Sequence, residues 1–330
     1  MSAALLDVRD LSIGLPGRLL VDRVSLRLAA GETLALVGES GCGKSMTALG
    51  VLGLLPPGVR IEAGVIAFEG RDMRRLSPRA LRALRGNRLA LVPQEPLAAL
   101  NPVQTVGAQV AEVLRHHQRL SARAARRRVA ELFDLVQLPE PQRRLDDFPH
   151  HLSGGQRQRV MIAMAVACNP RLLIADEPTT ALDVTIQAQI LELLGRLRAE
   201  LGMAMLLITH DLGVVAQWAD RVVVMYAGRV VEEAPVTPFF AAPLHPYARG
   251  LRAAALGPEG RHARTDRLPE IAGQVGSALG QAGCGFTPRC PRAQATCHLA
   301  PPPLEPCGTG RWLACPPAAQ EERQRVAALG

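Results

Sequence analysis

The chain has 330 residues, of which 48% are apolar and only 3% aromatic, and it carries a formal net charge of +8. This apolar fraction excludes a largely disordered chain. No apolar run approaches the ~18 residues that a membrane-spanning helix needs. The first ten residues lack a charged segment followed by an apolar core, so we expect no signal peptide and a cytosolic chain. The positive charge permits nucleic-acid binding, but few aromatic rings are available to stack on bases, which favours a solvated, arginine-rich surface.

Two residue types are unevenly distributed. Of the 38 basic residues 37 are arginines, and Lys44 is the only lysine. Its position therefore selects a compact ammonium that a guanidinium does not replace. Five of the seven cysteines lie in the last 50 residues, and in a cytosolic protein such a cluster suggests a metal site more than disulfides. These are Cys284, Cys290, Cys297, Cys307 and Cys315.

The first half of the chain predicts strands, then helices. Residues 24–28 alternate between apolar and polar, as in a half-buried strand, and the apolar strand 33–37 runs into a glycine-rich loop. A helix is expected over 45–55. From 77 to 138 the pattern is helical, with Ser77 and Ser121 as the residues that cap two helices. We interpret this stretch as a helical insertion in an α/β core.

The second half returns to the core. Residues 171–175, 203–208 and 221–226 are apolar runs typical of buried strands, and 186–201 has one apolar face typical of a helix. Alternating strands and helices predict a mostly parallel sheet. From 236 onwards prolines multiply and the pattern breaks, so a domain boundary is expected between residues 235 and 236.

The strongest local motif is the octapeptide GESGCGKS at 38–45, between a predicted strand and a predicted helix. It fits the phosphate-binding pattern G-x-x-x-x-G-K-[ST]. Glycines let successive backbone N–H groups surround phosphate oxygens, and the helix N-terminus favours negative charge. Lys44 would reach the β- and γ-phosphates of a nucleotide, and Ser45 would bind Mg²⁺. The nucleotide-binding residues expected here are Gly38, Glu39, Ser40, Gly41, Cys42, Gly43, Lys44, Ser45 and Met46.

A second motif places two carboxylates at the end of an apolar strand, in the sequence LLIADE at 172–177. Asp176 would hold Mg²⁺, and Glu177 would act as the general base that activates the attacking water. A strand that simply ends in solvated acids is the alternative. The order of the two motifs favours a P-loop nucleoside triphosphatase.

Between these motifs stands LSGGQ at 152–156. With it the chain resembles the ABC ATPase family, over about residues 5–235. The resemblance implies that Ser153, Gly154, Gly155 and Gln156 cover the ATP held by the loop of a second subunit. It also implies that Gln94 contacts Mg²⁺ and the water and senses a permease, that Asp183 lies in a loop crossing the dimer interface, and that His210 contacts the γ-phosphate.

One position departs from the family pattern. Members usually have an aromatic residue before the phosphate loop that stacks on adenine, whereas the segment GRLL at 17–20 has none. The guanidinium plane of Arg18 could stack on the base instead. The alternative is that the base binds weakly and the phosphates dominate.

The C-terminal part resembles the extension of bacterial peptide and nickel importers. The segments that carry this resemblance are PLHPY at 243–247, LPEIAG at 268–273 and GCGFTPRCP at 283–291. The spacing of Cys284, Cys290, Cys297 and Cys315 suits either zinc or an iron–sulfur cluster. The resemblance favours a [4Fe–4S] cluster, with Cys307 as a substitute ligand. Free cysteines in a loop-rich tail are the alternative.

We therefore predict an α/β P-loop (ABC ATPase) core with an antiparallel subdomain, a helical subdomain at about 77–160, and a small cysteine-containing C-terminal domain at 236–330. The predicted function is an ATP-hydrolysing subunit of a dipeptide or oligopeptide importer. Its expected partners are a second ATPase or a second copy, two membrane permeases and an extracytoplasmic solute-binding protein, with no nucleic acid. It would lie at the cytoplasmic face of the inner membrane. A soluble ABC ATPase acting on nucleic acid or ribosomes, and an importer of nickel or another solute, remain alternatives.

Overall fold

The computed structural model describes residues 4–180, 182–256, 271, 273 and 282–327, which form two compact units. Unit 1 comprises mainly residues 73–208. Unit 2 comprises residues 6–27, 33–72 and the described part of 209–330. The C-terminal extension thus belongs to the same unit as the N-terminal strands, and the predicted separate C-terminal domain is not confirmed.

Three parallel strands form the sheet of unit 1, in the order β8-β7-β6. They are β6 (Leu89–Val92), β7 (Leu172–Asp176) and β8 (Ala204–Thr209). Nearly every residue in them is buried, as expected of parallel strands covered on both faces. β6 lies inside the range that we expected to be helical, because four apolar residues are too few to show a period.

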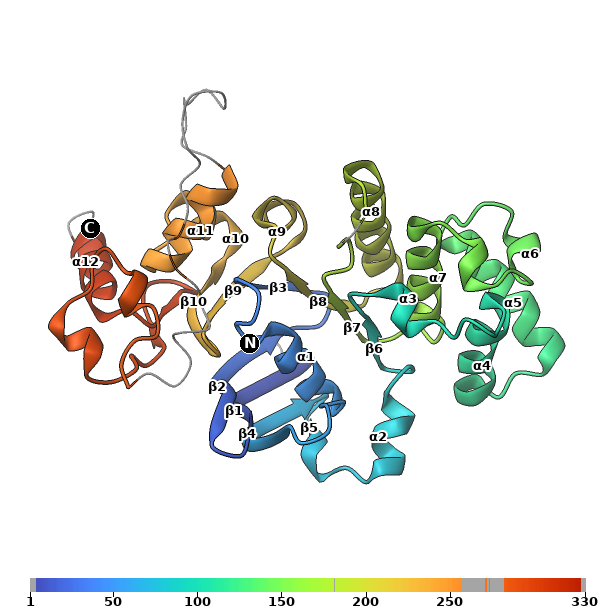
Figure 1. Ribbon diagram of the computed structural model, residues 1–330, viewed down its shortest axis with the longest axis horizontal. Coiled ribbons are helices and arrows are strands. Elements are labelled where there is room, and N and C mark those ends of the chain that lie inside the picture. Colours follow the sequence, from blue (N-terminus) through green and yellow to red (C-terminus); the bar gives the residue numbers. More distant parts are fainter. Residues whose placement is uncertain (1–3, 181, 257–270, 272, 274–281, 328–330) are drawn as a thin grey trace. The chain divides into compact units, whose positions relative to one another are not determined.

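Helices make up the rest of unit 1, and α4, α5 and α7 pack against one another (Figure 1). Ser77 and Ser121 accept hydrogen bonds from the N–H groups of Ala80 and Ala124, so both predicted caps are confirmed. In the described residues, no helix combines the length and the apolar character needed to cross a membrane. The helices are α2 (Pro78–Leu84), α3 (Pro96–Ala99), α4 (Val106–Gln118), α5 (Ala122–Leu135), α6 (Pro141–Arg144), α7 (Gly154–Val166) and α8 (Val184–Leu201).

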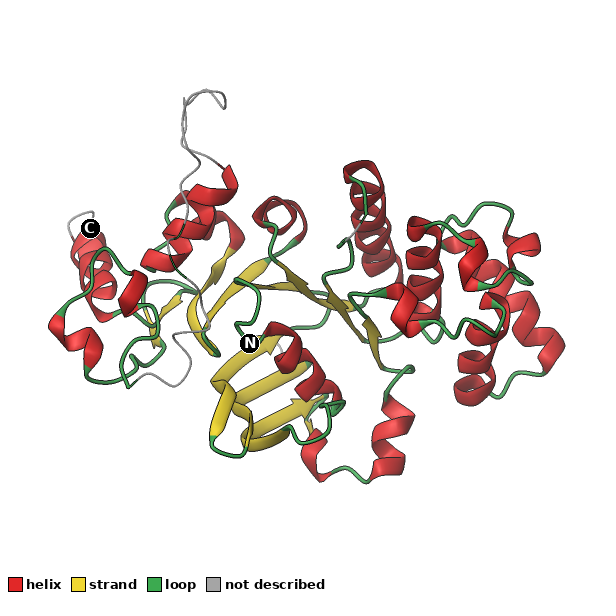
Figure 2. Ribbon diagram, viewed as in Figure 1, coloured by secondary structure: helices red, strands yellow, loops and turns green. Residues whose placement is uncertain are grey.

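Unit 2 contains an antiparallel sheet in the order β2-β1-β4-β5, on which α1 (Lys44–Leu52) packs through β1 (Figure 2). A bulge interrupts the β1–β4 pairing next to Gly64, which has φ +96°. A Cβ atom there would lie 2.6 Å from the Asp10 carbonyl oxygen, so only glycine fits. The strands are β1 (Leu6–Leu15), β2 (Arg18–Leu28), β4 (Arg60–Phe68) and β5 (Arg71–Asp72).

A second sheet of unit 2 has the order β11-β12-β10-β9-β3. β3 (Thr33–Val37) runs parallel to β9 (Arg221–Tyr226), and β10 (Arg229–Pro235) runs antiparallel to β9. The extension completes this sheet, because β12 pairs with β10. The remaining elements are β11 (Glu305–Pro306), β12 (Trp312–Leu313), α9 (Leu212–Trp218), α10 (Val236–Ala241), α11 (Pro246–Leu256) and α12 (Pro316–Ala327).

Candidate functional site

The predicted phosphate loop lies in unit 2, between the fully buried strand β3 and helix α1. Gly38 has φ +150° and Gly43 has φ +103°. A Cβ atom on Gly38 would lie 2.3 Å from the Met225 carbonyl oxygen, and one on Gly43 would lie 3.0 Å from that of Leu20. Both glycines are therefore needed for the loop to pass close to β9 and β2. No atom lies within 4 Å of a Cβ on Gly41, so that side of the loop is open.

Lys44 begins helix α1 and folds back over the loop. Its side chain is buried, with 6% of the residue exposed, and Nζ donates hydrogen bonds to the carbonyl oxygens of Gly38 (2.8 Å) and Glu39 (3.1 Å). Ser45 and Met46 are half-buried in the first turn. Burial raises the pKa of the neighbouring Cys42 thiol, which Lys44 lowers to a smaller extent. The loop thus holds one ammonium group at a helix N-terminus, an arrangement able to bind a phosphate chain.

Unit 2 also contains His210, which is exposed between β8 and α9. The next residue, Asp211, caps α9 by accepting hydrogen bonds from the N–H groups of Gly213 (2.7 Å) and Val214 (3.3 Å). This cap fixes the backbone beside His210 and leaves its imidazole open to solvent.

Arg18 is exposed at the start of β2, where it lines a cleft of about 510 Å³ in unit 2. The aromatic rings of Tyr226 and Phe286 line the same cleft, Phe286 being supplied by the extension. The size suits a small organic ring system.

The two predicted carboxylates lie in unit 1. Asp176 ends β7 and is 9% exposed. Glu177 follows with φ +44°, a left-handed conformation that a non-glycine residue adopts at some energetic cost. Its Oε2 accepts hydrogen bonds from Gln94 Nε2 (3.0 Å) and from the Thr180 hydroxyl (2.9 Å). The structure therefore brings together Gln94 and Glu177, and adds Thr180, which the sequence did not indicate.

The segment LSGGQ at 152–156 leads into helix α7 of unit 1, with Ser153 as the N-cap. Ser153 Oγ accepts from Gln156 N–H (3.4 Å), and Gln156 Oε1 accepts from Ser153 N–H (3.0 Å), which is a complete capping box. A Cβ atom on Gly155 would lie 2.7 Å from Ile186 Cγ2, so this glycine lets α7 approach α8 closely. The cap and the close approach leave the N-terminus of α7 rigid.

Asp183 was predicted in a dimer-interface loop. In the structure its Oδ1 accepts a hydrogen bond from Ile186 N–H (2.9 Å) and caps α8. Two residues before it, Ala181 lies outside the described residues. The side chain thus has a structural function within its own unit, which leaves the interface role a prediction.

Four of the predicted metal-binding cysteines, Cys284, Cys290, Cys297 and Cys315, line one small pocket of unit 2. Burial raises the pKa of Cys315 to about 11. Among the described residues, no group of three or more His, Cys, Asp or Glu side chains could hold a metal ion. Cys307 does not line this pocket but lies in an apolar cluster with Leu244 and Leu313, against which Cys315 packs, so its role as a substitute ligand stays a prediction.

The extension is fixed to β10 by a buried carboxylate. Glu232 is fully buried, and it accepts hydrogen bonds from the N–H groups of Leu244 (3.0 Å) and His245 (2.7 Å) and pairs with Arg311 (3.0 Å). Burial raises the pKa of Glu232, and these bonds lower it to a smaller extent. Tyr247 N–H donates to His245 Nδ1 (3.1 Å), so the imidazole accepts at that nitrogen.

A pH dependence follows from His245. Burial, with a smaller contribution from Arg249, lowers its pKa from 6.5 to about 3. The folded chain keeps the imidazole neutral while the unfolded chain protonates it below pH 6.5, so acid favours unfolding. Between pH 7 and 5 this group should lower the free energy of unfolding by about 2 kcal/mol. In His245→Asn, whose side-chain oxygen can accept from Tyr247 and does not titrate, urea unfolding should depend less on pH. Equal pH dependence in the two proteins would contradict the assignment.

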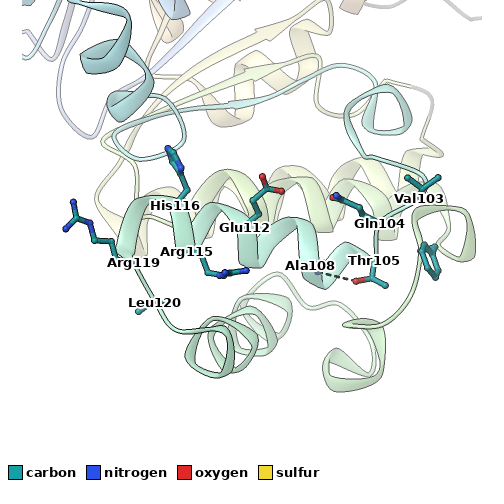
Figure 3. A pocket seen from close by; sticks show the side chains of 10 residues that line it. Val103, Gln104, Thr105, Ala108, Glu112, Arg115, His116, Arg119 and Leu120 are labelled. Atoms are coloured by element: carbon teal, nitrogen blue, oxygen red, sulfur yellow. Dashed lines mark hydrogen bonds between the residues drawn. The ribbon is translucent and has the colours of Figure 1, made fainter.

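A hollow on unit 1 lies along α4, as Figure 3 shows. It is lined by Val103, Thr105, Glu112, Arg115 and Arg119, among others. Val103 is 79% exposed, yet its backbone is held, because its N–H donates to Asn101 Oδ1 (3.1 Å).

Comparisons with known proteins identify the family to which the sequence is similar. The ABC transporter family matches residues 21–180, and the family described as oligopeptide/dipeptide transporter, C-terminal region, matches residues 231–297. The chain is 50% identical to a probable peptide ABC transporter ATP-binding protein of Sinorhizobium fredii over 317 residues, which cover 94% of each chain. It is also 50% identical to a putative peptide import ATP-binding protein of Brucella abortus, with 92% and 90% covered.

Solved structures show the same fold. A dimeric ATP-binding cassette in a post-hydrolysis state, bound to ADP and Pi, is similar with a TM-score of 0.63 and 28% identity, over 70% of this chain and 98% of that one. The protein cbiO1 of Clostridium perfringens, part of the ABC transporter complex cbiONQ, gives 0.63 and 28%, over 72% and 91%. The predicted fold class and family are confirmed: the chain belongs to the ATP-binding proteins of peptide ABC transporters.

Proposed function

We propose that this chain binds and hydrolyses ATP to drive the import of peptides. The observation that carries the proposal is the phosphate loop, in which close-packed glycines hold Lys44 at the N-terminus of α1. An ammonium and a helix N-terminus together favour a triphosphate. Residues 38–46 would surround the phosphates.

The chemistry would use residues of several of the predicted motifs. Ser45, Gln94 and Asp176 supply oxygen atoms, which Mg²⁺ prefers as ligands. Glu177 would take a proton from the water that attacks the γ-phosphorus, and His210 would contact the γ-phosphate. The hydrogen bond from Gln94 Nε2 to Glu177 Oε2 supports this assignment, because a metal ligand and the general base would both have to lie close to the attacking water.

Hydrolysis would take place in a dimer, as the family implies. Ser153, Gly154, Gly155 and Gln156 would cover the ATP of the partner subunit, and the rigid N-terminus of α7 suits a γ-phosphate. Asp183 would lie near the interface. Binding of ATP would favour the closed dimer, and hydrolysis would release it. The partner is either a second homologous ATPase or a second copy of this chain.

We further propose that the chain is peripheral at the cytoplasmic face of the inner membrane, bound to two permeases that receive solute from an extracytoplasmic binding protein. We assign the hollow of Figure 3 to the binding of a permease loop. The residues that line it follow Gln94 in the sequence, and one of them, Val103, is an exposed apolar residue. The names of the two relatives support a peptide as the solute, since one is a peptide ABC transporter ATP-binding protein and the other a peptide import ATP-binding protein.

The test is affinity capture of the chain from gently solubilised membranes. We expect two polytopic permeases in the eluate. The captured amount of both should be lower with Val103→Arg and unchanged with Leu299→Arg. Leu299 is a matched control because it is also an exposed apolar residue (76%), in unit 2. Capture of ribosomal proteins or nucleic acid without permeases would overturn the transport function in favour of a soluble ABC ATPase.

Arg18 is the proposed partner of the adenine ring. Since a cation–π contact at an exposed site is worth about 0.5–1 kcal/mol, Arg18→Ala should weaken ATP binding by roughly two- to fivefold and leave inorganic triphosphate binding unchanged. Fluorescence titration of both ligands measures this. Arg60→Ala, on an exposed arginine of β4, is the control. Unchanged ATP affinity in Arg18→Ala would contradict the stacking role.

Finally, we propose a [4Fe–4S] cluster on Cys284, Cys290, Cys297 and Cys315. Their convergence on one pocket supports it. A four-iron cluster holds its thiolates further apart than one zinc ion does, so the lack, among the described residues, of a group that could hold a single metal ion does not contradict a cluster. Anaerobically purified protein should contain iron and acid-labile sulfide, which Cys297→Ala should lower and Cys168→Ala, at a buried cysteine of unit 1, should not. Absence of iron and sulfide would exclude the cluster.

A further inference from the structure

The second residue of the phosphate loop is held by the C-terminal extension. Both Glu39 carboxylate oxygens accept hydrogen bonds from the Arg289 guanidinium, Oε2 from Nη1 (2.8 Å) and Oε1 from Nη2 (3.0 Å). The side chain of Arg289 is only 6% exposed, and that of Glu39 is 28% exposed. This is a bidentate ion pair that is largely removed from water. Its two parallel hydrogen bonds fix the relative orientation of the two side chains, which a surface ion pair does not.

The backbone of the same residue is also bound by the extension. Glu39 N–H donates to the Tyr247 hydroxyl at 2.8 Å. Tyr247 is fully buried, at the start of α11, and its own N–H donates to His245, which Glu232 in turn holds. The hydroxyl is therefore placed by a chain of buried hydrogen bonds that leads back to β10.

Arg289 is itself fixed on several sides. Its Nη2 also donates to the Ile271 carbonyl oxygen (2.8 Å), and Nη1 to the Tyr226 hydroxyl (3.3 Å). The guanidinium carbon lies 5.7 Å from the centre of the Tyr226 ring and 6.0 Å from that of Phe286. The hydrogen bond to Glu39 raises the pKa of Arg289, burial lowers it to a smaller extent and the bond to Tyr226 raises it further, so the group stays charged.

Three groups thus fix Glu39: Arg289 at its carboxylate, Tyr247 at its N–H, and Lys44 at its carbonyl oxygen. We propose that Arg289 and Tyr247 are positioning residues for ATP binding, which hold the phosphate loop, and with it Lys44, in the form that receives the triphosphate. This inference rests on the proposed ATPase function. A loop ordered before binding loses less entropy when the ligand arrives, so its affinity is higher.

The experiment is a double-mutant cycle on ATP affinity and steady-state hydrolysis, with full-length protein. Arg289→Ala and Glu39→Gln should each raise the Kd and the KM for ATP roughly tenfold, with kcat at saturating ATP nearly unchanged. The double variant should be no worse than either single variant. Arg289→Lys should recover part of the loss, and Tyr247→Phe, which keeps the ring, should raise the KM by a smaller factor.

A control variant and the ATP binding of the original protein separate the possible failures. Arg323→Ala removes an exposed ion pair with Glu305 in the same extension and should leave the KM unchanged. If the original protein binds ATP and the effects of Arg289→Ala and Glu39→Gln simply add, or if Arg289→Ala lowers only the melting temperature, the positioning role is wrong. If the original protein itself does not bind ATP, the proposed function fails instead. Glu39→Gln keeps every backbone contact, so it tests the pair even if Arg289→Ala does not fold.

Discussion

Replacing Glu177 by glutamine should lower the rate of ATP hydrolysis by about 10²–10⁴-fold, the usual contribution of a general base. ATP binding should persist, because glutamine has nearly the same shape and its oxygen can still accept a hydrogen bond from Gln94 or Thr180. The closed dimer should therefore accumulate with ATP bound. Phosphate release and size-exclusion chromatography with and without Mg²⁺-ATP measure the two effects.

A matched control for this variant is Glu200→Gln, which alters an exposed carboxylate at the end of α8. Its hydrolysis rate and elution volume should equal those of the original protein. Normal turnover in Glu177→Gln would show that another group accepts the proton. Loss of both binding and hydrolysis would mean that the substitution disturbs the strained backbone at φ +44° instead of the chemistry.

Exchanging Lys44 for arginine should lower ATP affinity about 10- to 100-fold, although the formal charge is kept. A charged hydrogen bond is worth about 1.5–3 kcal/mol. The buried ammonium donates to two loop carbonyls at about 3 Å, and the wider, planar guanidinium does not fit the same space. Lys44→Met should lose at least as much. Equilibrium binding of a fluorescent ATP analogue measures the affinity.

The control for Lys44→Arg is the reverse exchange, of an arginine for a lysine, at a solvent-exposed position. Arg60→Lys, at an exposed ion pair on β4, should leave binding unchanged, because a solvated cation tolerates either side chain. If Lys44→Arg binds ATP as the original protein does, the presence of a single lysine among 38 basic residues has no functional reason at this loop.

Local patterns predicted the elements that carry the motifs. The strand at residues 221–226 matches β9, and both serine caps lie where the sequence placed them. These features depend on a few neighbouring residues, so a pattern can express them. The strand β4 was missed because its first residues are largely exposed and its partner, β1, lies about 50 residues earlier.

The contacts of the extension could not be predicted, for the same reason. Glu232 stands next to a second acidic residue, Glu233, and would be taken for a solvated acid, yet it is fully buried and pairs with Arg311. Arg289 and Glu39 are 250 positions apart. No periodicity links such residues. The resemblance of the segment at 243–247 to importer extensions did mark Tyr247, but gave no indication of its hydrogen bond to Glu39.

The burial of the single lysine has a practical consequence for proteolysis. An endoproteinase specific for lysine can cut this chain at one bond only, between Lys44 and Ser45, inside the first turn of α1. Because Lys44 is 6% exposed and the residues that follow it are helical, cleavage requires the loop to open locally. The cleavage rate therefore reports the free energy of loop opening when reclosing is faster than cutting. A nucleotide bound at the loop should slow the cut, which turns a simple two-fragment digest into a binding assay.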